Sequence, residues 1–489
     1  MTAKRILFAA VLVLVVGAAL AGLRATTSTP NSRRTEPVTA SADDQVGLAI
    51  TVYNTSLALI RDVREFVLPA GESELQFVDI AATVNPATVH FRSLTEPSRL
   101  SVLEQNYEFD LLEPDKLLRK YIGREITMVR IRTENGTTRT ENVKATLVSY
   151  NNGPIWKIGD EYVTGLTSDH LRFPELPANL YSRPTLVWKL ANRGGAQHRI
   201  ETSYLAGGLS WNADYVLTVG RDDKTADLDG WVTLTNRSGT GFRDARLQLV
   251  AGDLNRVEPV AQKRALEMMA AARSAADSKM AEEAFSEYHL YTLGRRTTVA
   301  NGQTKQLALL NGTGIPVDKR YVVDGQQFYY RNRQSPGAPI KDNVQVFYRF
   351  RNDDKSGLGV PMPGGVVRVY QADARGGLQF VGEDRIDHTP KDEHIDLKIG
   401  NAFDIVCERN QTDFARIADS VYEAEFAVTL RNHKTTPVTV QVNEPVGGTW
   451  RMLQSSHDWQ KTAAWAAQFT VPVGAEGATT LRYRVRITY

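Results

Sequence analysis

Apolar and polar residues alternate with a period of two through most of the chain from Val46 onward. The clearest case is residues 481–489, where Leu, Tyr, Val, Ile and Tyr alternate with arginines and a threonine. A strand places successive side chains on opposite faces, so this pattern predicts one buried and one solvated face. Similar alternation occurs in residues 344–350, 426–430 and 438–442. The chain is therefore predicted to be an all-β protein made of antiparallel sheets.

A short motif recurs where several predicted strands end. An apolar residue and one spacer are followed by an asparagine and a polar or glycine-containing turn, at Asn192, Asn236, Asn352 and Asn432. Asparagine tolerates left-handed backbone angles and can close an Asx turn, so we expect hairpin corners at these positions. Four such corners favour immunoglobulin-like β-sandwiches, in which two sheets pack face to face, over other all-β forms.

Length and pattern divide the region after residue 45 into several parts. We expect a β-rich N-terminal domain over residues 46–184, the first part of a β-sandwich region over 185–257, and a C-terminal β-sandwich region over 289–489. Residues 258–288 interrupt the strand pattern, because they are alanine-rich with helical spacing. We interpret them as a helical linker or excursion between two β units. The alternative is a helix that contacts a partner or a membrane surface.

The N-terminal domain contains a segment with its own pattern. Residues 113–118 predict a short helix, with Pro114 in its first turn. Predicted strands follow at residues 126–130, 143–150 and 155–158. Their spacing is compatible with a small barrel inserted in the domain.

The first residues predict export. Lys4 and Arg5 precede an unbroken apolar run over residues 6–23, which contains an A-x-A site near its end. This arrangement is typical of a signal peptide, here residues 1–21. The same run is long enough to remain as an uncleaved anchor over residues 6–23, which is the alternative. Residues 22–45 are rich in Thr and Ser and are expected to form a flexible linker.

Cysteine usage and charge exclude two classes of protein. Cys407 is the only cysteine, so no intramolecular disulfide can form and lipid attachment directly after the signal is ruled out. The chain has 58 basic and 56 acidic residues, which leaves no overall field to attract nucleic acid or an anionic membrane. We expect an extracytoplasmic location, in the periplasm or at the cell surface, with membrane contact only through residues 6–23 if they are retained.

The densest group of possible metal ligands lies in residues 384–394, where Asp387, His388, Glu393 and His394 occur close together. Imidazoles and carboxylates could hold a divalent ion if a hairpin gathered them. Their spacing matches no established zinc pattern, so a polar loop is the preferred interpretation. A metal-dependent hydrolase that uses this loop is the enzymatic alternative.

The other potentially catalytic or ligand-binding residues lack the neighbouring groups that such motifs require. Cys407 has no adjacent base and is expected to be a small buried side chain. Ser210 lacks the following glycine of a nucleophile elbow, and prolines in the glycine-rich residues 357–365 prevent a phosphate cradle. The sequence therefore predicts no catalytic set, no cofactor and no metal site. Several aromatic residues could stack on sugar rings, although a core role is the more usual one. They are Phe328, Tyr329, Tyr330, Trp450, Trp459 and Trp465.

Several segments resemble a bacterial domain-of-unknown-function family that includes the mucoidy-inhibitor A proteins. The similar segments lie in order within residues 204–489: Ser210–Tyr215, Val360–Tyr370, Phe380–Asp384, His388–Pro390, Gly400–Asp404 and the region from Leu430 to Tyr489. The resemblance implies an exported β-rich envelope protein without established catalytic residues, and the mucoidy name hints at exopolysaccharide. The coiled-coil front end of those relatives is replaced here by the strand-rich residues 46–184.

These observations favour a non-enzymatic envelope protein that binds or scaffolds polysaccharide or another envelope protein. The alternatives are the hydrolase described above and a membrane-tethered assembly component that docks through residues 258–288.

Overall fold

The computed structural model describes residues 36–108, 112–134, 137–151, 153–165, 170–177, 180–181, 183–252, 280–285, 288–334 and 339–489. The predicted signal or anchor lies outside these residues. Within them, the only α-helix is α1 (Pro114–Lys120), and 33 strands form several sheets. The all-β prediction is confirmed. No helix among the described residues is long and apolar enough to cross a bilayer.

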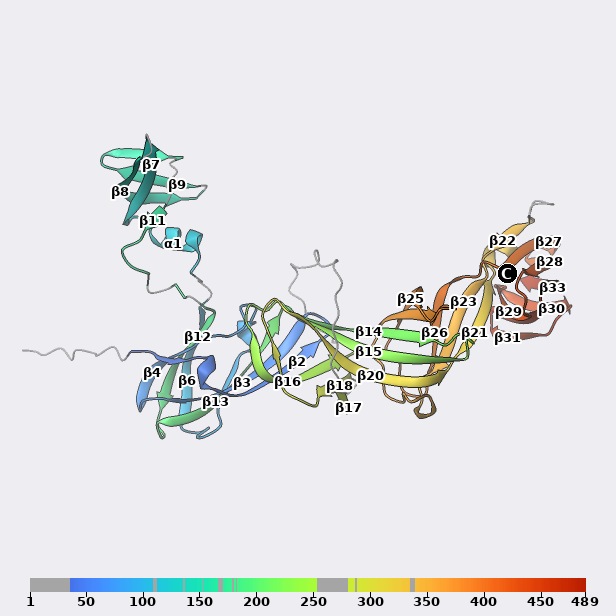
Figure 1. The fold of residues 1–489 in the computed structure, drawn as a ribbon, viewed down its shortest axis with the longest axis horizontal. Helices are drawn as coiled ribbons and strands as arrows, with labels where there is room; N and C mark the ends of the chain where they lie inside the picture. The colour runs from blue at the N-terminus through green and yellow to red at the C-terminus, as the bar shows by residue number, and fades with distance from the viewer. Residues whose placement is uncertain are drawn as a thin grey trace, which may run out of the picture.

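The molecule is elongated, with sheets following one another along its length (Figure 1). A four-stranded and an eight-stranded sheet build the N-terminal end. The first has the order β1 (Val38–Ala40), β4 (Gly71–Phe77), β12 (Thr185–Asn192), β6 (Leu100–Glu108). The second has the order β17 (Met280–Phe285), β18 (Tyr288–Leu293), β16 (Phe242–Ala251), β2 (Gln45–Tyr53), β3 (Leu57–Val67), β13 (Gln197–Gly207), β5 (His90–Ser93), and β19 (Thr297–Val299) pairs with β16. Strands β12 and β13 thus complete the same sheets as strands from the first hundred residues.

A five-stranded sheet continues this body toward the middle of the molecule. Its order is β20 (Thr304–Pro316), β15 (Thr225–Asn236), β14 (Leu209–Val219), β24 (Gly365–Ala372), β25 (Leu378–Ile386). Strand β14 packs against β2 and β3 of the eight-stranded sheet. Because of this overlap, one apolar core joins these three sheets, with buried side chains from Ala40 to Leu397. The insert and the C-terminal sandwich have separate cores.

The C-terminal end is a sandwich of two sheets with its own apolar core. The six-stranded sheet has the order β26 (His394–Asn401), β23 (Gln345–Arg351), β21 (Asp318–Asp324), β29 (Val438–Pro445), β32 (Ala466–Val473), β31 (Trp459–Ala463). The five-stranded sheet has the order β22 (Ile340–Asp342), β27 (Ile405–Ala418), β28 (Val421–Asn432), β33 (Ala478–Thr488), β30 (Thr449–Ser455). Residues 481–488 of the alternating segment lie in β33 and bury Leu481, Tyr483, Val485 and Ile487, as predicted. Tyr489 was expected on the same buried face, but it follows the end of the strand and is 45% exposed.

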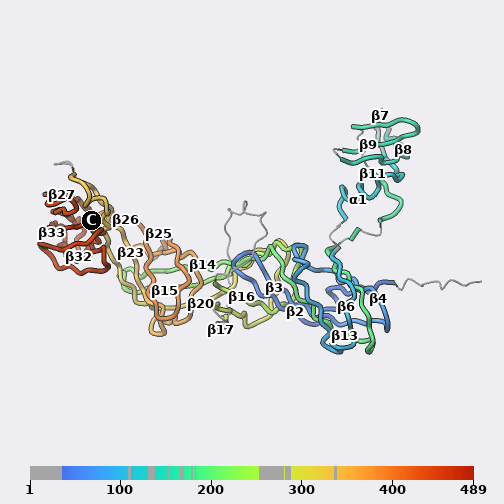
Figure 2. The backbone as a smooth tube through the Cα atoms, turned by 180° about the vertical axis from the view of Figure 1, so that it is seen from behind, coloured from blue at the N-terminus to red at the C-terminus, as the bar shows by residue number. Residues whose placement is uncertain are grey.

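The insert stands away from the N-terminal sheets (Figures 1 and 2). Helix α1 begins at Pro114, as predicted, and precedes a sheet with the order β10 (Glu161–Thr164), β9 (Pro154–Ile158), β8 (Thr137–Tyr150), β7 (Glu125–Glu134), β11 (His170–Arg172). Trp156 and Tyr121 are buried in its small core. The described strands form an open row, so the expectation of a closed small barrel was wrong. Strand spacing alone does not indicate whether the first and last strands of a sheet meet.

The prediction of a helix over residues 258–288 was wrong at its end. Residues 253–279 lie outside the described part of the chain, but Met280–Phe285 forms β17 and pairs with β18 along its whole length. Pairing at the edge of a large sheet overrode the helical preference of this composition.

The four asparagine corners join different sheets rather than adjacent strands of one sheet. They connect β12 to β13, β15 to β16, β23 to β24 and β28 to β29, and no strand of these pairs hydrogen-bonds to its successor. The hairpin prediction was therefore wrong. A turn signal in the sequence does not distinguish a return within one sheet from a crossing to the opposite sheet.

Each corner asparagine is buried and hydrogen-bonded to the backbone of the turn. At Asn192, Asn236 and Asn432 the side-chain Oδ1 accepts from the backbone N–H two residues later, at 2.9 to 3.0 Å, which is the predicted Asx turn. At Asn352, Oδ1 accepts instead from the backbone N–H of Gly359 at 3.1 Å. In all four, Nδ2 donates to backbone carbonyls of the connecting segments.

Candidate functional site

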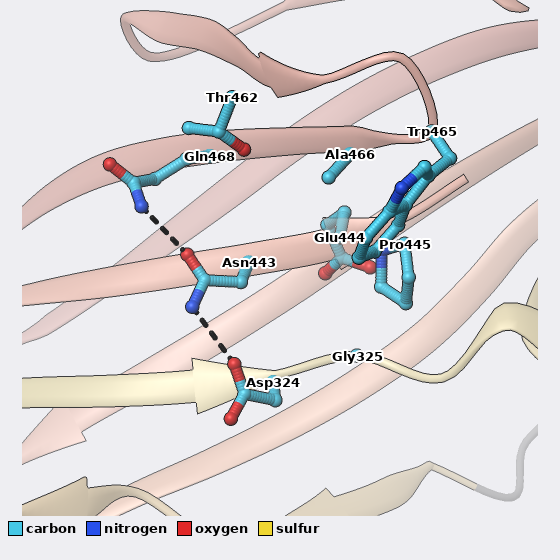
Figure 3. A pocket seen from close by; sticks show the side chains of 9 residues that line it. All are labelled: Asp324, Gly325, Asn443, Glu444, Pro445, Thr462, Trp465, Ala466 and Gln468. Carbon is cyan, nitrogen blue, oxygen red and sulfur yellow. Dashed lines mark hydrogen bonds between the residues drawn. The ribbon is translucent and has the colours of Figure 1, made fainter. Parts of the chain in front are cut away.

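The outer face of the six-stranded C-terminal sheet contains a candidate surface site. A hollow of about 380 Å³ opens there between the end of β21, strand β29 and the turn that joins β31 to β32. Polar side chains occupy one side and an aromatic side chain the other (Figure 3). Its lining residues are Asp324, Gly325, Asn443, Glu444, Pro445, Thr462, Trp465, Ala466 and Gln468.

Strand alternation decides which side chains reach this face. In β29, Val440, Val442 and Glu444 point inward and are fully buried, whereas Asn443 and Pro445 point outward and remain partly exposed. The register places Asn443 opposite Gln468 of β32 and Asp324 of β21. The three polar side chains therefore share one face on adjacent strands.

These side chains form a hydrogen-bonded row across the strands. Gln460 on β31 donates to Gln468 at 2.8 Å, and Gln468 donates to Asn443 at 3.0 Å. Asn443 donates from Nδ2 to Asp324 Oδ1 at 2.8 Å, and Gln345 on β23 donates to Asp324 Oδ2 at 2.8 Å. We call Gln460, Gln468, Asn443, Asp324 and Gln345 the amide row. Each amide carries both a hydrogen-bond donor and an acceptor. The row can therefore bind ligand groups that both donate and accept hydrogen bonds, such as hydroxyls.

Trp465 provides the aromatic side of the hollow. It lies in the turn between β31 and β32, where its side chain is 57% exposed. Figure 3 shows its ring standing beside Pro445, at the opposite end of the hollow from Asp324. By contrast, Trp450 is buried and donates from Nε1 to the carbonyl of Ala464 at 2.9 Å. The preceding turn residue is thereby tied to the core, which positions Trp465.

A buried charged network lies beneath this face. Arg409 of β27 is fully buried and donates to Glu444 Oε1 at 2.5 Å and to Asp342 Oδ2 at 2.8 Å. Tyr330 donates to Glu444 Oε2 at 2.6 Å and lies 2.8 Å from the hydroxyl of Tyr483. The network ties β22, β27, β29 and β33 together behind the strand that carries Asn443.

Burial and charge act in opposite directions on this network. Burial alone would lower the pKa of Arg409, but Glu444 and the surrounding acidic groups hold it well above its usual value. Burial, reinforced by Glu444, raises the pKa of Tyr330 well above its usual value. Arg409 is therefore permanently charged and Tyr330 neutral, which suits a structural role.

Only a glycine fits at position 325, where the buried network meets the hollow. A Cβ at this position would lie 2.3 Å from Glu444 Oε2. Any side chain here would displace the carboxylate from Arg409 and Tyr330.

The loop that was the alternative metal site does not gather its possible ligands. The side chains of Asp387, His388, Glu393 and His394 are exposed. His388 Nδ1 accepts a hydrogen bond from the backbone N–H of Gly364 at 3.0 Å, which is a turn contact. Across the part of the chain that the structure describes, no three His, Cys, Asp or Glu side chains are placed to hold a metal ion.

The remaining sequence candidates are mostly structural. Cys407 is buried, and this burial raises the pKa of its thiol to about 12, so the thiolate is not formed at neutral pH. Tyr329 and Tyr330 are buried, whereas Phe328 is 62% exposed. Ser210 lies within β14. Only Trp465 among these candidates lines the hollow.

Sequence reasoning missed the amide row and the Arg409 network. One signal for the network was present, because Arg409 falls on the same inward register as Ile405 and Cys407 of β27. The row gives no comparable signal, since its members become neighbours only through cross-strand register.

Comparison with known proteins does not assign the chain to a family. No family model matches the chain, and no curated protein sequence is significantly similar to it.

Proposed function

We propose that this chain is an exported, non-enzymatic envelope protein that binds polysaccharide on the outer face of its six-stranded C-terminal sheet. The observation that carries the proposal is the amide row beside the exposed ring of Trp465. Export rests on the signal-like residues 1–21, and the link to an envelope role rests on the family resemblance over residues 204–489.

The chemistry of the face suits a sugar chain. Sugar hydroxyls donate and accept, as do the amides of Gln468 and Asn443. An indole ring offers a flat apolar surface for the C–H groups of a sugar ring, and Trp465 exposes more than half of its area. Sites of this kind combine a hollow with an aromatic wall and a few placed polar groups.

The face is also preorganised. Each amide in the row is already held by its neighbours, and β29 is anchored from behind through Glu444 and Arg409. Little side-chain freedom is therefore lost when a ligand binds, which favours affinity.

Retention on a panel of immobilised neutral and acidic polysaccharides tests this function. Trp465→Ala should weaken binding at least about tenfold, equivalent to about 1.4 kcal/mol. Tyr162→Ala is the matched control, because Tyr162 is 69% exposed and lies on β10 of the insert, away from the C-terminal sheet. Equal loss in both variants, or no retention on any polysaccharide, would contradict the proposal and favour an envelope protein as the partner.

A further inference from the structure

The amide row extends well beyond the hollow. The hollow spans the ends of β21, β29 and β32, whereas the row begins at Gln460 on the edge strand β31 and reaches Gln345 on β23. The register then places Asn401 of β26 directly opposite Gln345. Six strands at about 4.8 Å spacing give a polar track about 24 Å long.

Both ends of this track are open. Gln460 and Asn401 lie on the two outermost strands of the sheet, and both residues are exposed. A site for a monosaccharide or for a chain end has donors and acceptors converging on one place. Here they are spread along a line that crosses the strands.

The charge on the track is small and negative. Asp324 is its only charged member, and each of its carboxylate oxygens accepts a hydrogen bond from an amide. Two flanking arginines, Arg320 and Arg349, both pair with Asp396, at 3.7 and 2.5 Å. A third cation, Lys398 of β26, is exposed on the same face opposite Phe347, beside the end of the track. Within the track itself the only charge is Asp324, which repels an acidic sugar.

A straight track requires a chain that stays extended, as the ribbon of a β-linked glucan does and the coil of an α-linked glucan does not. We infer that the track binds an internal segment of an extended, uncharged, β-linked glucan, laid across the strands from β31 to β26. This inference rests on the proposed function and specifies its ligand. Trp465 and the hollow hold one part of the chain, and the amides on either side hold the sugars that follow.

A size series of cello-oligosaccharides, from disaccharide to octasaccharide, tests the inference by titration calorimetry with the full chain. Affinity should rise at least tenfold along the series. Gln460→Ala and Asn401→Ala, at the two ends, should each weaken binding of the octasaccharide several-fold. Gln454→Ala, on an exposed position of the opposite sheet, is the matched control and should change nothing.

The outcomes separate the inference from the proposed function. Equal affinity for the shortest and longest oligosaccharides, unaffected end variants, or tighter binding of a matched oligogalacturonate would overturn the inference and leave polysaccharide binding standing. Binding of some other polysaccharide in the panel but of no cello-oligosaccharide would also overturn it. Failure to bind any carbohydrate would overturn both.

Discussion

At the scale of single residues, the C-terminal sandwich depends on a charge in its core. Arg409 and Glu444 are both fully buried, and the Arg409 guanidinium also lies 5.1 Å from the centre of the Tyr329 ring. Burying two charges is costly, but removing one partner leaves the other uncompensated in a dry environment. Replacing either Arg409 or Glu444 alone should therefore destabilise the sandwich around β29, the strand that carries Asn443.

Arg409→Gln should destabilise the C-terminal sandwich by about 3 to 5 kcal/mol, because Glu444 and Asp342 lose their common partner. Arg482→Gln, on the exposed face of β33, is the matched control and should cost less than about 0.5 kcal/mol. Urea unfolding of both variants measures the difference. Equal midpoints would show that the network does not stabilise the sandwich.

The raised pKa of Tyr329 predicts that the folded state loses stability at alkaline pH. Burial, followed by the charge of Asp342, raises its pKa from 10.0 to about 12. Between these pH values the folded state keeps a proton that the unfolded state has lost, so stability falls as pH rises through this window. Tyr329→Phe should make that fall shallower in urea titrations on either side of the window. An unchanged slope would assign the pH dependence to other tyrosines.

At the scale of elements, the corner asparagines hydrogen-bond neighbouring loops to one another at the ends of the sandwiches. Asn432 illustrates this, because its Nδ2 donates to Thr436 and to Gly474, which lies in the loop before β33. One side chain thus holds the crossing turn and a neighbouring loop together.

Asn432→Ala should cost about 2 kcal/mol, since buried backbone groups lose their partners. Asn410→Ala removes an asparagine from an exposed strand position and should have little effect. Thermal unfolding of the two variants provides the comparison. Similar losses in both would mean that the corner bonds contribute nothing specific.

The outward and inward faces of β28, β29 and β33 could be predicted from alternation, and α1 from Pro114, because these signals are local. The crossing at Asn432 could not, since it depends on which sheet the next strand joins. The same limit applies to the binding face. Gln460, Gln468 and Asn443 look like ordinary solvated positions until the strands pair.

At the scale of the whole molecule, the sandwiches are joined into a rod. Strand β23 contributes Val346 to the C-terminal core and Tyr348 and Phe350 to the long N-terminal core. Val344, directly before the strand, also belongs to the C-terminal core. Asp223, at the tip between β14 and β15, accepts hydrogen bonds from Lys319 at 3.0 Å, from Gln371 at 2.8 Å and from Tyr348. One carboxylate therefore ties three strands together at the joint.

Solution scattering tests this joint. A compact chain of 489 residues would have a radius of gyration of about 23 Å, and the rod should exceed it clearly. Asp223→Ala should broaden the distance distribution at the joint, whereas Asp222→Ala should not.

The joint should also resist acid. Burial alone would raise the pKa of Asp223, but hydrogen bonds from Tyr348 and Lys319 hold it below 3.8. Ionised Asp223 therefore contributes its full stabilisation above pH 3.8, the pKa of an unperturbed aspartate. This stabilisation is lost as the pH falls through the lower pKa that Asp223 has in the folded chain. The joint should therefore hold at pH 5 to 7 and loosen only below about pH 4. A rod that already bends between pH 5 and 7 would contradict this role of Asp223.

Hydrogen–deuterium exchange of the full chain, with and without a bound polysaccharide, tests the central claim most directly. A ligand on the C-terminal sheet should slow exchange in residues 441–445 and 459–468, on the strands and turn that carry Asn443, Gln468 and Trp465. Protection confined to the insert or to the N-terminal sheets, with these residues unchanged, would contradict it.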